Sequence, residues 1–273
     1  MTEMITSTAN PQIKAARKLA DRRERQAGGL YLAEGLRIAI EAIQQGSDIQ
    51  KIIHAPDLLR SHIGWEKISE FEQQHPDRVL QVSESVFRSL AQKDHPQGVA
   101  VVIRQSWHEL DDIRLIAGSL WVALDQVADP GNLGTILRSL DGVNADGIIL
   151  LDQCTDPYDP SAIRASMGAV LTRKLVKTSF DKFEKWAHGN GVSVVGTSDK
   201  ADRNFHDYRY PNPMILMMGS ERQGLDVAHQ ELCSDMISIP MRGKNDSLNL
   251  AVATGIVLYE IDHQRHIKGK ESR

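Results

Sequence analysis

Several features that would assign this chain of 273 residues to a particular class of protein are scarce or missing. It has no run of eighteen apolar residues, so we expect no membrane-spanning helix. Cys154 and Cys233 are its only cysteines, too few for a disulfide framework, and we expect both to be reduced, buried apolar residues. The first residues show no basic stretch followed by an apolar core, so a secretory signal is not expected. These absences favour a cytoplasmic protein.

Two kinds of enzyme are disfavoured by the motifs that are missing. A nucleotide-binding oxidoreductase carries G-x-G-x-x-G after an early strand, with an acidic residue about twenty positions later, and neither half of the chain has this pattern. A zinc site needs clustered Cys or His ligands. His263 and His266 have a ligand-like spacing, but they stand near a predicted helix end, where a solvated imidazolium is favoured. We therefore expect no metal.

The distribution of charge is more informative than its sum, which is only −4. Six basic and two acidic residues fall between Asn10 and Leu30, a local charge of six minus two, or +4, on a segment with helical spacing. Such a stripe can pair with phosphates, although a solvated helix face with internal ion pairs would look the same. The candidate RNA-binding residues are Lys14, Arg17, Lys18, Arg22 and Arg25.

Strand-like and helix-like segments alternate along the chain, which predicts an α/β fold. In the first part we expect strands at 31–33, 49–54, 79–82 and 98–103, and helices at 11–26, at 35–45 and from 83. In the second part we expect strands at 120–124, 147–151, 192–196, 214–218 and 236–239, and helices at 133–143, 161–167, 180–188 and 248–266. Several of the later strands are continuous apolar runs, typical of a parallel sheet covered on both faces. The polar stretch between the parts predicts domains at 1–105 and 119–273, joined by a linker at 106–118.

Three blocks rich in Gly and polar residues follow short apolar strands of the second part. They span residues 125–138, 218–225 and 239–250. Loops at the carboxyl ends of parallel strands converge on one crevice, so the blocks could form a single site. In the first, Asn132 could cap a helix and Arg138 could present its guanidinium to a phosphate. In the third, Ser247 is a strong helix-cap candidate. Each block alone also fits a purely structural turn.

In this order, the three blocks resemble those of the SpoU/TrmH branch of the SPOUT RNA methyltransferases, over roughly residues 121–260. The resemblance implies a deep trefoil knot, a homodimer, S-adenosylmethionine as methyl donor and transfer to a ribose 2′-oxygen of RNA. Residues 7–12, the basic segment and residues 31–35 resemble an L30e-like substrate-binding domain. The presence of such a domain favours 23S ribosomal RNA over tRNA as the substrate of this protein. A tRNA ribose methyltransferase and a non-catalytic RNA-binding protein of the same fold remain alternatives.

The resemblance also assigns roles to individual residues of the three blocks. Asn132 and Arg138 match the active-site pair of the first block, Glu221 matches the acidic residue of the second, and Ser247 and Asn249 match the polar pair of the third. Arginine keeps its charge when free in solution. The sequence therefore leaves two roles for Arg138: a base made neutral by the site, or a cation that stabilises the developing alkoxide. Ser247 could equally serve only as a helix cap, and Glu221 could equally serve mainly to hold the loops in position.

A second group of residues matches the donor-binding loops of the family. It comprises Thr197, Gly219, Ile239, Met241 and Leu248. Thr197 follows a different strand from the three blocks, and its match is the loosest of the five. Together these residues predict where S-adenosylmethionine binds.

Overall fold

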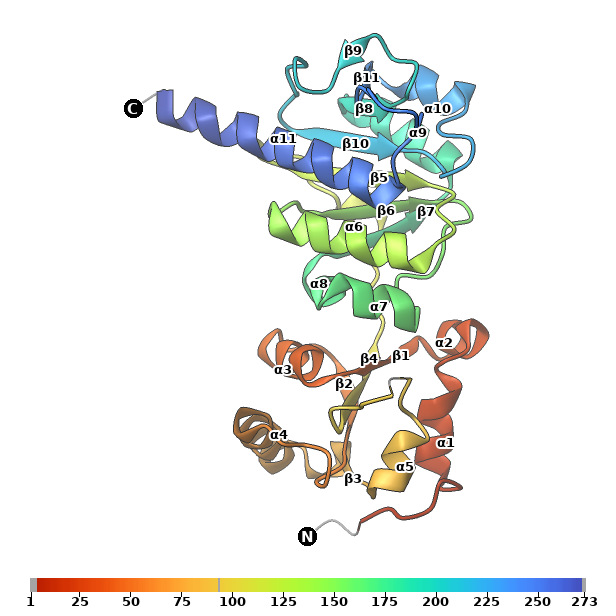
Figure 1. The fold of residues 1–273 in the computed structure, drawn as a ribbon, viewed down its shortest axis with the longest axis vertical. Helices are drawn as coiled ribbons and strands as arrows, with labels where there is room; N and C mark the ends of the chain where they lie inside the picture. Colours follow the sequence, from red (N-terminus) through yellow and green to blue (C-terminus); the bar gives the residue numbers. More distant parts are fainter. Residues whose placement is uncertain (1–3, 93, 272–273) are drawn as a thin grey trace. The chain divides into compact units, whose positions relative to one another are not determined.

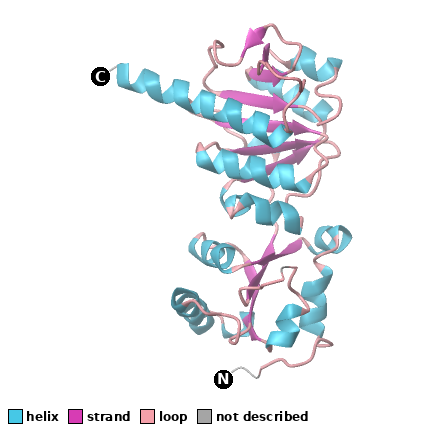
Figure 2. Cartoon of the chain, viewed as in Figure 1, coloured by secondary structure: helices cyan, strands magenta, loops and turns pink. Residues whose placement is uncertain are grey.

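The computed structural model describes residues 4–92 and 94–271, the last five of them by their backbone only. The chain forms two compact units. The first contains the residues up to Gln105 together with Tyr158–Thr172, and the second contains Ser106–Pro157 and the residues from Arg173 onward. Each unit is a β-sheet accompanied by helices, as Figure 2 shows, which confirms the expected α/β class.

The sheet of the first unit has the order β1-β4-β2-β3. Its strands are β1 (Leu30–Glu34), β2 (Ile49–His54), β3 (Val79–Gln81) and β4 (Val99–Arg104). Strand β4 is antiparallel to β1 and β2, whereas β2 and β3 are parallel. The accompanying helices are α1 (Pro11–Lys18), α2 (Arg22–Gly28), α3 (Leu36–Gln44), α4 (His62–Gln74), α5 (Glu84–Arg88) and the 3₁₀ turn η1 (Pro76–Arg78).

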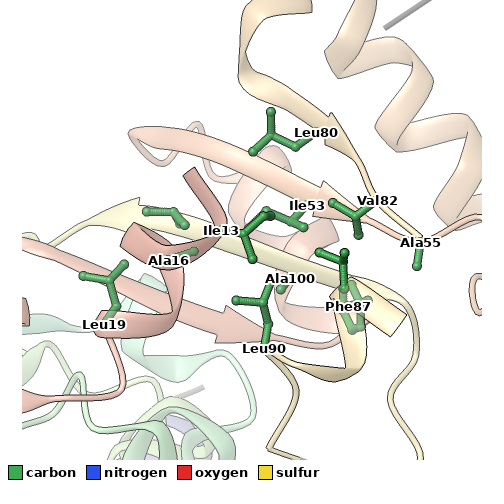
Figure 3. Packing of buried hydrophobic residues seen from close by; sticks show 12 residues of the cluster. Ile13, Ala16, Leu19, Ile53, Ala55, Leu80, Val82, Phe87, Leu90 and Ala100 are labelled. Atoms are coloured by element: carbon green, nitrogen blue, oxygen red, sulfur yellow. The ribbon is translucent and has the colours of Figure 1, made fainter. Parts of the chain in front are cut away.

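Helices α1 and α5 pack their apolar sides onto this sheet to form the core of the first unit (Figure 3). Ile13 of α1 and Phe87 of α5 are fully buried in one cluster with Ile53 and Ala100 of the sheet. Burying a side chain of this size stabilises the fold by about 1.5–3 kcal/mol. A charge at Ile13 would therefore detach α1.

The basic segment does not form the single helix that was expected over residues 11–26. Helix α1 ends at Lys18, and Asp21 begins α2 by accepting a hydrogen bond from the backbone N–H of Arg23 at 2.7 Å. An aspartate at this position satisfies free backbone donors of a new helix, so the chain restarts there instead of continuing.

The second unit contains a seven-stranded sheet with the order β7-β6-β5-β10-β8-β11-β9 (Figure 1). Its paired strands are all parallel. They are β5 (Leu120–Asp125), β6 (Gly147–Leu151), β7 (Lys174–Thr178), β8 (Val194–Thr197), β9 (Arg203–Asn204), β10 (Met214–Met218) and β11 (Asp235–Ser238). The sequence pattern missed β7 and β9. Both lie at the edges of the sheet, where polar side chains interrupt the apolar run.

Helices α6 (Pro130–Gly142) and α11 (Leu250–Glu271) lie side by side in the second unit (Figure 1). A Cβ atom at Gly255 of α11 would lie 3.5 Å from the hydroxyl of Ser139 on α6, which shows how closely the helices approach. The cap of α6 is Asp129, whose Oδ1 accepts from the N–H of Asn132 at 2.7 Å, so the cap expected at Asn132 is wrong. Pro130 occupies the first helical position, where its missing N–H costs nothing.

The unit also contains α9 (Phe180–Asn190), α10 (Val227–Leu232) and the 3₁₀ turn η2 (Leu110–Asp112). Residues 106–118, expected as a linker, are anchored to this unit because Ile113 is buried in its core. Among the described helices, none has the length and apolarity to cross a membrane.

Helices α7 (Pro160–Ser166) and α8 (Ala169–Thr172) follow β6 in the chain but belong to the first unit. Two contacts of the residues before α7 explain this grouping. The ring of Tyr158 lies 4.6 Å from that of Tyr31, and Asp159 forms a 3.4 Å ion pair with Arg25. The boundaries drawn from the sequence had placed these residues in the second domain, because aromatic and ionic contacts over such separations leave no local pattern.

Candidate functional site

The three blocks converge at one end of the second sheet. Strands β5, β10, β8 and β11 are consecutive neighbours and run parallel, so their carboxyl ends share one edge. The first block follows β5, the second follows β10 and the third follows β11. Thr197 ends β8, between the last two. The three blocks and Thr197 thus lie side by side at this edge of the sheet.

Asn132 connects the three blocks through its carboxamide. Its Nδ2 donates to Oε1 of Glu221 at 3.1 Å, and its Oδ1 accepts from Nδ2 of Asn249 at 2.9 Å. Each partner comes from a different block, about ninety or more residues further along the chain. Because an amide offers a donor and an acceptor at once, one side chain can join an acidic loop to a second amide. The structure therefore brings together three of the five predicted catalytic residues.

Asn249 also begins helix α11. Its Oδ1 accepts from the backbone N–H groups of Ala251 and Val252 at 3.0 and 3.3 Å. The expectation that Ser247 caps this helix is therefore wrong, because the helix begins later and its cap is the amide. With Oδ1 held by the helix, Nδ2 of Asn249 is directed to Asn132. Ser247 is exposed in the preceding loop.

The second block is a tight loop that presents Glu221 to solvent. Ser220 and Gly224 pair through two backbone hydrogen bonds of 3.2 and 3.0 Å, and Gly224 has a φ of +67°. At Gly219, a Cβ atom would collide with the backbone of Gly224. A glycine is therefore required for the loop to close over the end of β10.

Arg138 lies on the same helix as Asn132 but outside this hydrogen-bond network. The two residues are six positions apart, and an α-helix turns about 100° per residue, so they point to different sides of α6. Arg138 is exposed, and no hydrogen bond or ion pair joins it to another residue in the described part of the chain. Its guanidinium is available to a ligand.

The residues expected to bind the donor lie around the ends of β8, β10 and β11. Thr197 donates from Oγ1 to the sulfur of Met218 at 3.4 Å, which links two of these strand ends. Ile239 is half-buried, whereas Met241 and Leu248 leave 37% and 36% of their surface exposed. Apolar side chains left partly uncovered beside polar loops are typical of a ligand-binding surface.

The sequence pattern missed an acid–base cluster next to the first two blocks, in which His229 and Asp125 are buried and Asp226 is exposed. His229 of α10 is 4% exposed; its Nδ1 lies 2.6 Å from Asp226, and its Nε2 lies 3.5 Å from Asp125 at the end of β5. The ring of Phe180 lies 3.8 Å from the imidazole. The signal that could have identified this cluster is Asp125, a carboxylate at the end of a wholly apolar strand.

The pKa values of the two carboxyl groups in this cluster are shifted in opposite directions. Burial raises the pKa of Asp125, and the nearby Asp226 and Asp152 add to the rise while His229 opposes it. The pKa of Asp226 is lowered by the hydrogen bonds it accepts from the backbone and side chain of His229. The imidazole thus connects the loop after the second block to the strand that leads into the first.

The basic segment is only partly available to a ligand. Arg25 is 1% exposed and donates to the carbonyls of Leu19 and Ala20 at 3.0 and 2.8 Å, in addition to its ion pair with Asp159. Its predicted contact with RNA does not fit this burial. Arg17 donates to the backbone carbonyl and hydroxyl of Ser89 at 3.2 and 2.7 Å.

The other three predicted basic residues are on the surface of the first unit. Lys14, Lys18 and Arg22 are exposed, and Lys18 lies 3.9 Å from Glu24. An exposed ion pair of this length contributes little and does not withdraw the lysine from solvent.

Comparison with known proteins gives matches along nearly the whole chain. Residues 119–259 match the SpoU rRNA Methylase family, and residues 10–101 match an MRM3-like substrate binding domain. A 23S rRNA (uridine(2479)-2′-O)-methyltransferase of Streptomyces viridochromogenes is 30% identical over 90% of this chain and 87% of its own length. A 23S rRNA (guanosine(2553)-2′-O)-methyltransferase of Bacillus subtilis is 25% identical over 95% of this chain and 99% of its own.

A solved structure extends the similarity to three dimensions. The AdoMet-bound rRNA methyltransferase from Sinorhizobium meliloti superimposes with a TM-score of 0.88 and 34% identity, covering 96% of this chain and 98% of that one. The likeness therefore extends over both units.

Proposed function

Because this chain belongs to the SpoU rRNA methylase family, we propose that it transfers a methyl group from S-adenosylmethionine to a ribose 2′-hydroxyl of 23S ribosomal RNA. Membership confirms the resemblance seen in the three blocks. The observation that carries the activity is the hydrogen-bond chain from Glu221 through Asn132 to Asn249, which ties those blocks together at one sheet edge. A purely RNA-binding protein would have no use for this assembly, and the relatives' 23S rRNA substrates favour ribosomal RNA over tRNA.

The donor fits the residues at the strand ends. S-adenosylmethionine supplies an electrophilic methyl carbon when it is bound. The partly exposed side chains of Met241 and Leu248 offer an apolar surface for its adenine, and the loop closed at Gly219 offers backbone groups to its polar parts. Thr197 and Ile239 border the same edge of the sheet.

Arg138 is assigned to the acceptor hydroxyl. A guanidinium keeps its proton in proteins, so we assign it as the cation that stabilises charge on the ribose oxygen. The hydroxyl proton passes to solvent water as the methyl group moves from the donor sulfur to that oxygen. Ser247, exposed in the third block, would orient the ribose. Asn132, Glu221 and Asn249 hold the loops in place, and such positioning can supply up to about 7–11 kcal/mol of the barrier reduction.

We assign recognition of the RNA backbone to the first unit. Lys14, Lys18 and Arg22 are its exposed candidates for phosphate contact, and Arg17 keeps part of its surface exposed. The first unit thus acts as the substrate-binding domain, and the second unit acts as the methyltransferase domain.

A second copy of the chain is the proposed partner of helix α11. Val252, Ile256 and Tyr259 are 50%, 36% and 56% exposed and follow helical spacing along one side of α11. They line an open hollow of about 410 Å³ with Thr135 and Ser139 of α6. A row of apolar side chains with no cover favours a self-complementary interface between copies. Sedimentation equilibrium should give a dimer, and Tyr259→Glu should shift it to monomer.

The strand order agrees with a knotted chain. Strand β10 pairs between β5 and β8, although β8 precedes it in sequence, and β11 then pairs on the far side of β8. We propose that the segment leading to α11 completes a trefoil knot here. We place the enzyme in the cytoplasm, whose reducing conditions keep the thiols of Cys154 and Cys233 reduced.

Incubation of purified 23S rRNA, and separately of total tRNA, with labelled S-adenosylmethionine tests the proposal. The label should enter 23S rRNA at one nucleotide, and mapping should place it on the 2′-oxygen of ribose. Label on a base nitrogen, or in tRNA alone, would overturn this assignment. Binding of the donor by calorimetry separates an enzyme from a non-catalytic binder, which should show none.

A further inference from the structure

A pocket in the first unit has no part in the proposed chemistry. It encloses about 300 Å³ between helix α3, the end of β1 and helix α7. Its walls are largely apolar, formed by Leu19, Leu32, Ile38, Leu90 and Ile163. This volume is at the small end of the usual range for ligand pockets, which suits one heterocyclic base better than a larger molecule.

One carboxylate oxygen of the pocket lacks a donor in the described part of the chain. Oε2 of Glu34 accepts from the backbone N–H of Gln92 at 2.9 Å, whereas Oε1 is buried and has no hydrogen-bond partner in the described part of the chain. A buried carboxylate oxygen without a donor is costly and rare. A small turn of the carboxylate would bring Oε1 to the pocket that Glu34 lines, where a ligand N–H could satisfy it.

Two guanidinium groups border the same pocket. Arg37 of α3 is exposed and forms no hydrogen bond or ion pair with the residues that the structure describes. Arg164 of α7 donates a long 3.3 Å hydrogen bond to the hydroxyl of Ser161. The pocket therefore offers a carboxylate inside and two cations at its border, groups that suit the base and the phosphate of a nucleotide.

The backbone beside α7 is held in an uncommon conformation. Met167 has a φ of +54°, which non-glycine residues seldom adopt, and Gly168 follows with a φ of +105°. This turn leaves Met167 at the pocket with 42% of its surface exposed. Strained residues of this kind cluster at ligand-binding sites, and a thioether is well suited to pack on the face of a base.

We propose that this pocket binds an unstacked guanine base of the RNA substrate, with Glu34 accepting from the base and Arg37 and Arg164 pairing with its phosphate. This base is distinct from the nucleotide that accepts the methyl group. RNA is read in this way wherever single-stranded bases are splayed into protein pockets.

Guanine is preferred because of the acceptor that the pocket presents. A carboxylate has two oxygens and, when ionised, no donor. Guanine carries two neighbouring N–H donors, at N1 and N2, on its pairing edge. Adenine and cytosine each place a ring-nitrogen acceptor beside their amino group, and uracil places carbonyl oxygens on both sides of its single N–H. Those acceptors would face the carboxylate and repel it.

The probe for this site is guanosine 5′-monophosphate, added to the full-length chain labelled with ¹³C at its methionine methyl groups. The signal of Met167 is identified by its loss in Met167→Leu. We expect this signal to shift when guanosine monophosphate is added at millimolar concentration. The same shift should require at least about tenfold higher concentrations of the adenosine, cytidine or uridine nucleotide. No shift with any nucleotide, or equal shifts with all four, would overturn the proposal.

Variants then test the two parts of the pocket. Glu34→Gln keeps the shape of the side chain but replaces an acceptor by a donor, so guanine affinity should fall about tenfold or more. The double variant Arg37→Glu with Arg164→Glu should lower nucleotide affinity similarly without removing the base preference. Arg60→Glu, an exposed arginine of the same unit that does not line the pocket, is the matched control and should leave affinity unchanged. If Arg60→Glu lowers the nucleotide affinity and the pocket variants do not, the proposed site is refuted.

This inference rests on the proposed function, but the two can fail separately. If the pocket proposal is wrong and the enzyme assignment is right, Glu34→Gln will methylate 23S rRNA with unchanged KM and show the same nucleotide titration as the parent. If the pocket is right, KM for the RNA should rise while affinity for S-adenosylmethionine, measured by calorimetry, stays the same. Binding of guanosine monophosphate by a chain that methylates no RNA would overturn the enzyme assignment alone.

Discussion

Replacing Asn132 by aspartate changes one atom of the side chain that joins the three blocks. The acceptor for Asn249 is kept, but the donor to Glu221 becomes a negatively charged oxygen. The group it faces is Oε1 of Glu221, which now accepts from Asn132 at 3.1 Å. The variant therefore converts a hydrogen bond into a repulsion without altering the shape of the side chain.

The size of the effect follows from the observed geometry. Two unit charges at 3.1 Å repel by about 1.3 kcal/mol at the dielectric constant of water and by about 5 kcal/mol at a value of about 20. Glu221 is exposed, so solvent screens the pair and the lower end applies. With the lost hydrogen bond included, we expect a cost of about 2 kcal/mol, or about a 30-fold fall in kcat/KM.

The assay is methylation of 23S rRNA by Asn132→Asp, by Glu221→Gln and by the double variant. Glu221→Gln alone retains an oxygen that can accept from Asn132. In the double variant the glutamine amide can donate to the new carboxylate, so most of the lost activity should return. Asn245→Asp adds the same charge to the exposed third block and serves as the control. Parent-like activity in Asn132→Asp, or no recovery in the double variant, would refute the bridging role.

Three further outcomes follow from the second unit. Arg138→Ala should abolish turnover while calorimetry shows donor binding intact, and parent-like turnover would refute the assignment. Gly219→Ala should prevent donor binding because its Cβ would collide with the backbone of Gly224, and calorimetry should show this loss in a folded variant. Asp125 has a pKa raised by burial, so the folded state binds its proton more tightly than the unfolded state and loses stability as pH rises through that pKa. Asparagine cannot ionise, so urea unfolding should show the stability of Asp125→Asn rising relative to the parent as the pH increases above about 3.9, the ordinary pKa of aspartate. A difference that stays constant with pH would contradict this.

Regular elements were largely predictable because their signals are local. The apolar runs at 147–151 and 214–218 are strands with the expected bounds, and a parallel sheet buried on both faces requires such runs. The order of the three blocks along the chain was sufficient to recognise the family. Capping was less predictable: Asn249 and Asp129 took the roles expected of Ser247 and Asn132, because several residues near each helix start can cap it.

What the sequence determined by itself is which short segments are helices and strands, and which loops carry Gly, Asn, Glu and Arg after a strand. Only the tertiary structure decided which of those side chains meet. It joined Asn132 to partners about ninety or more residues away and buried Arg25 against Asp159. It also left Oε1 of Glu34 without a donor among the described residues, in the pocket that Arg164 borders. The reason is physical: periodicity and turn chemistry act over a few neighbouring residues, whereas a hydrogen bond or an ion pair depends on strand order and helix packing, which local pattern does not encode.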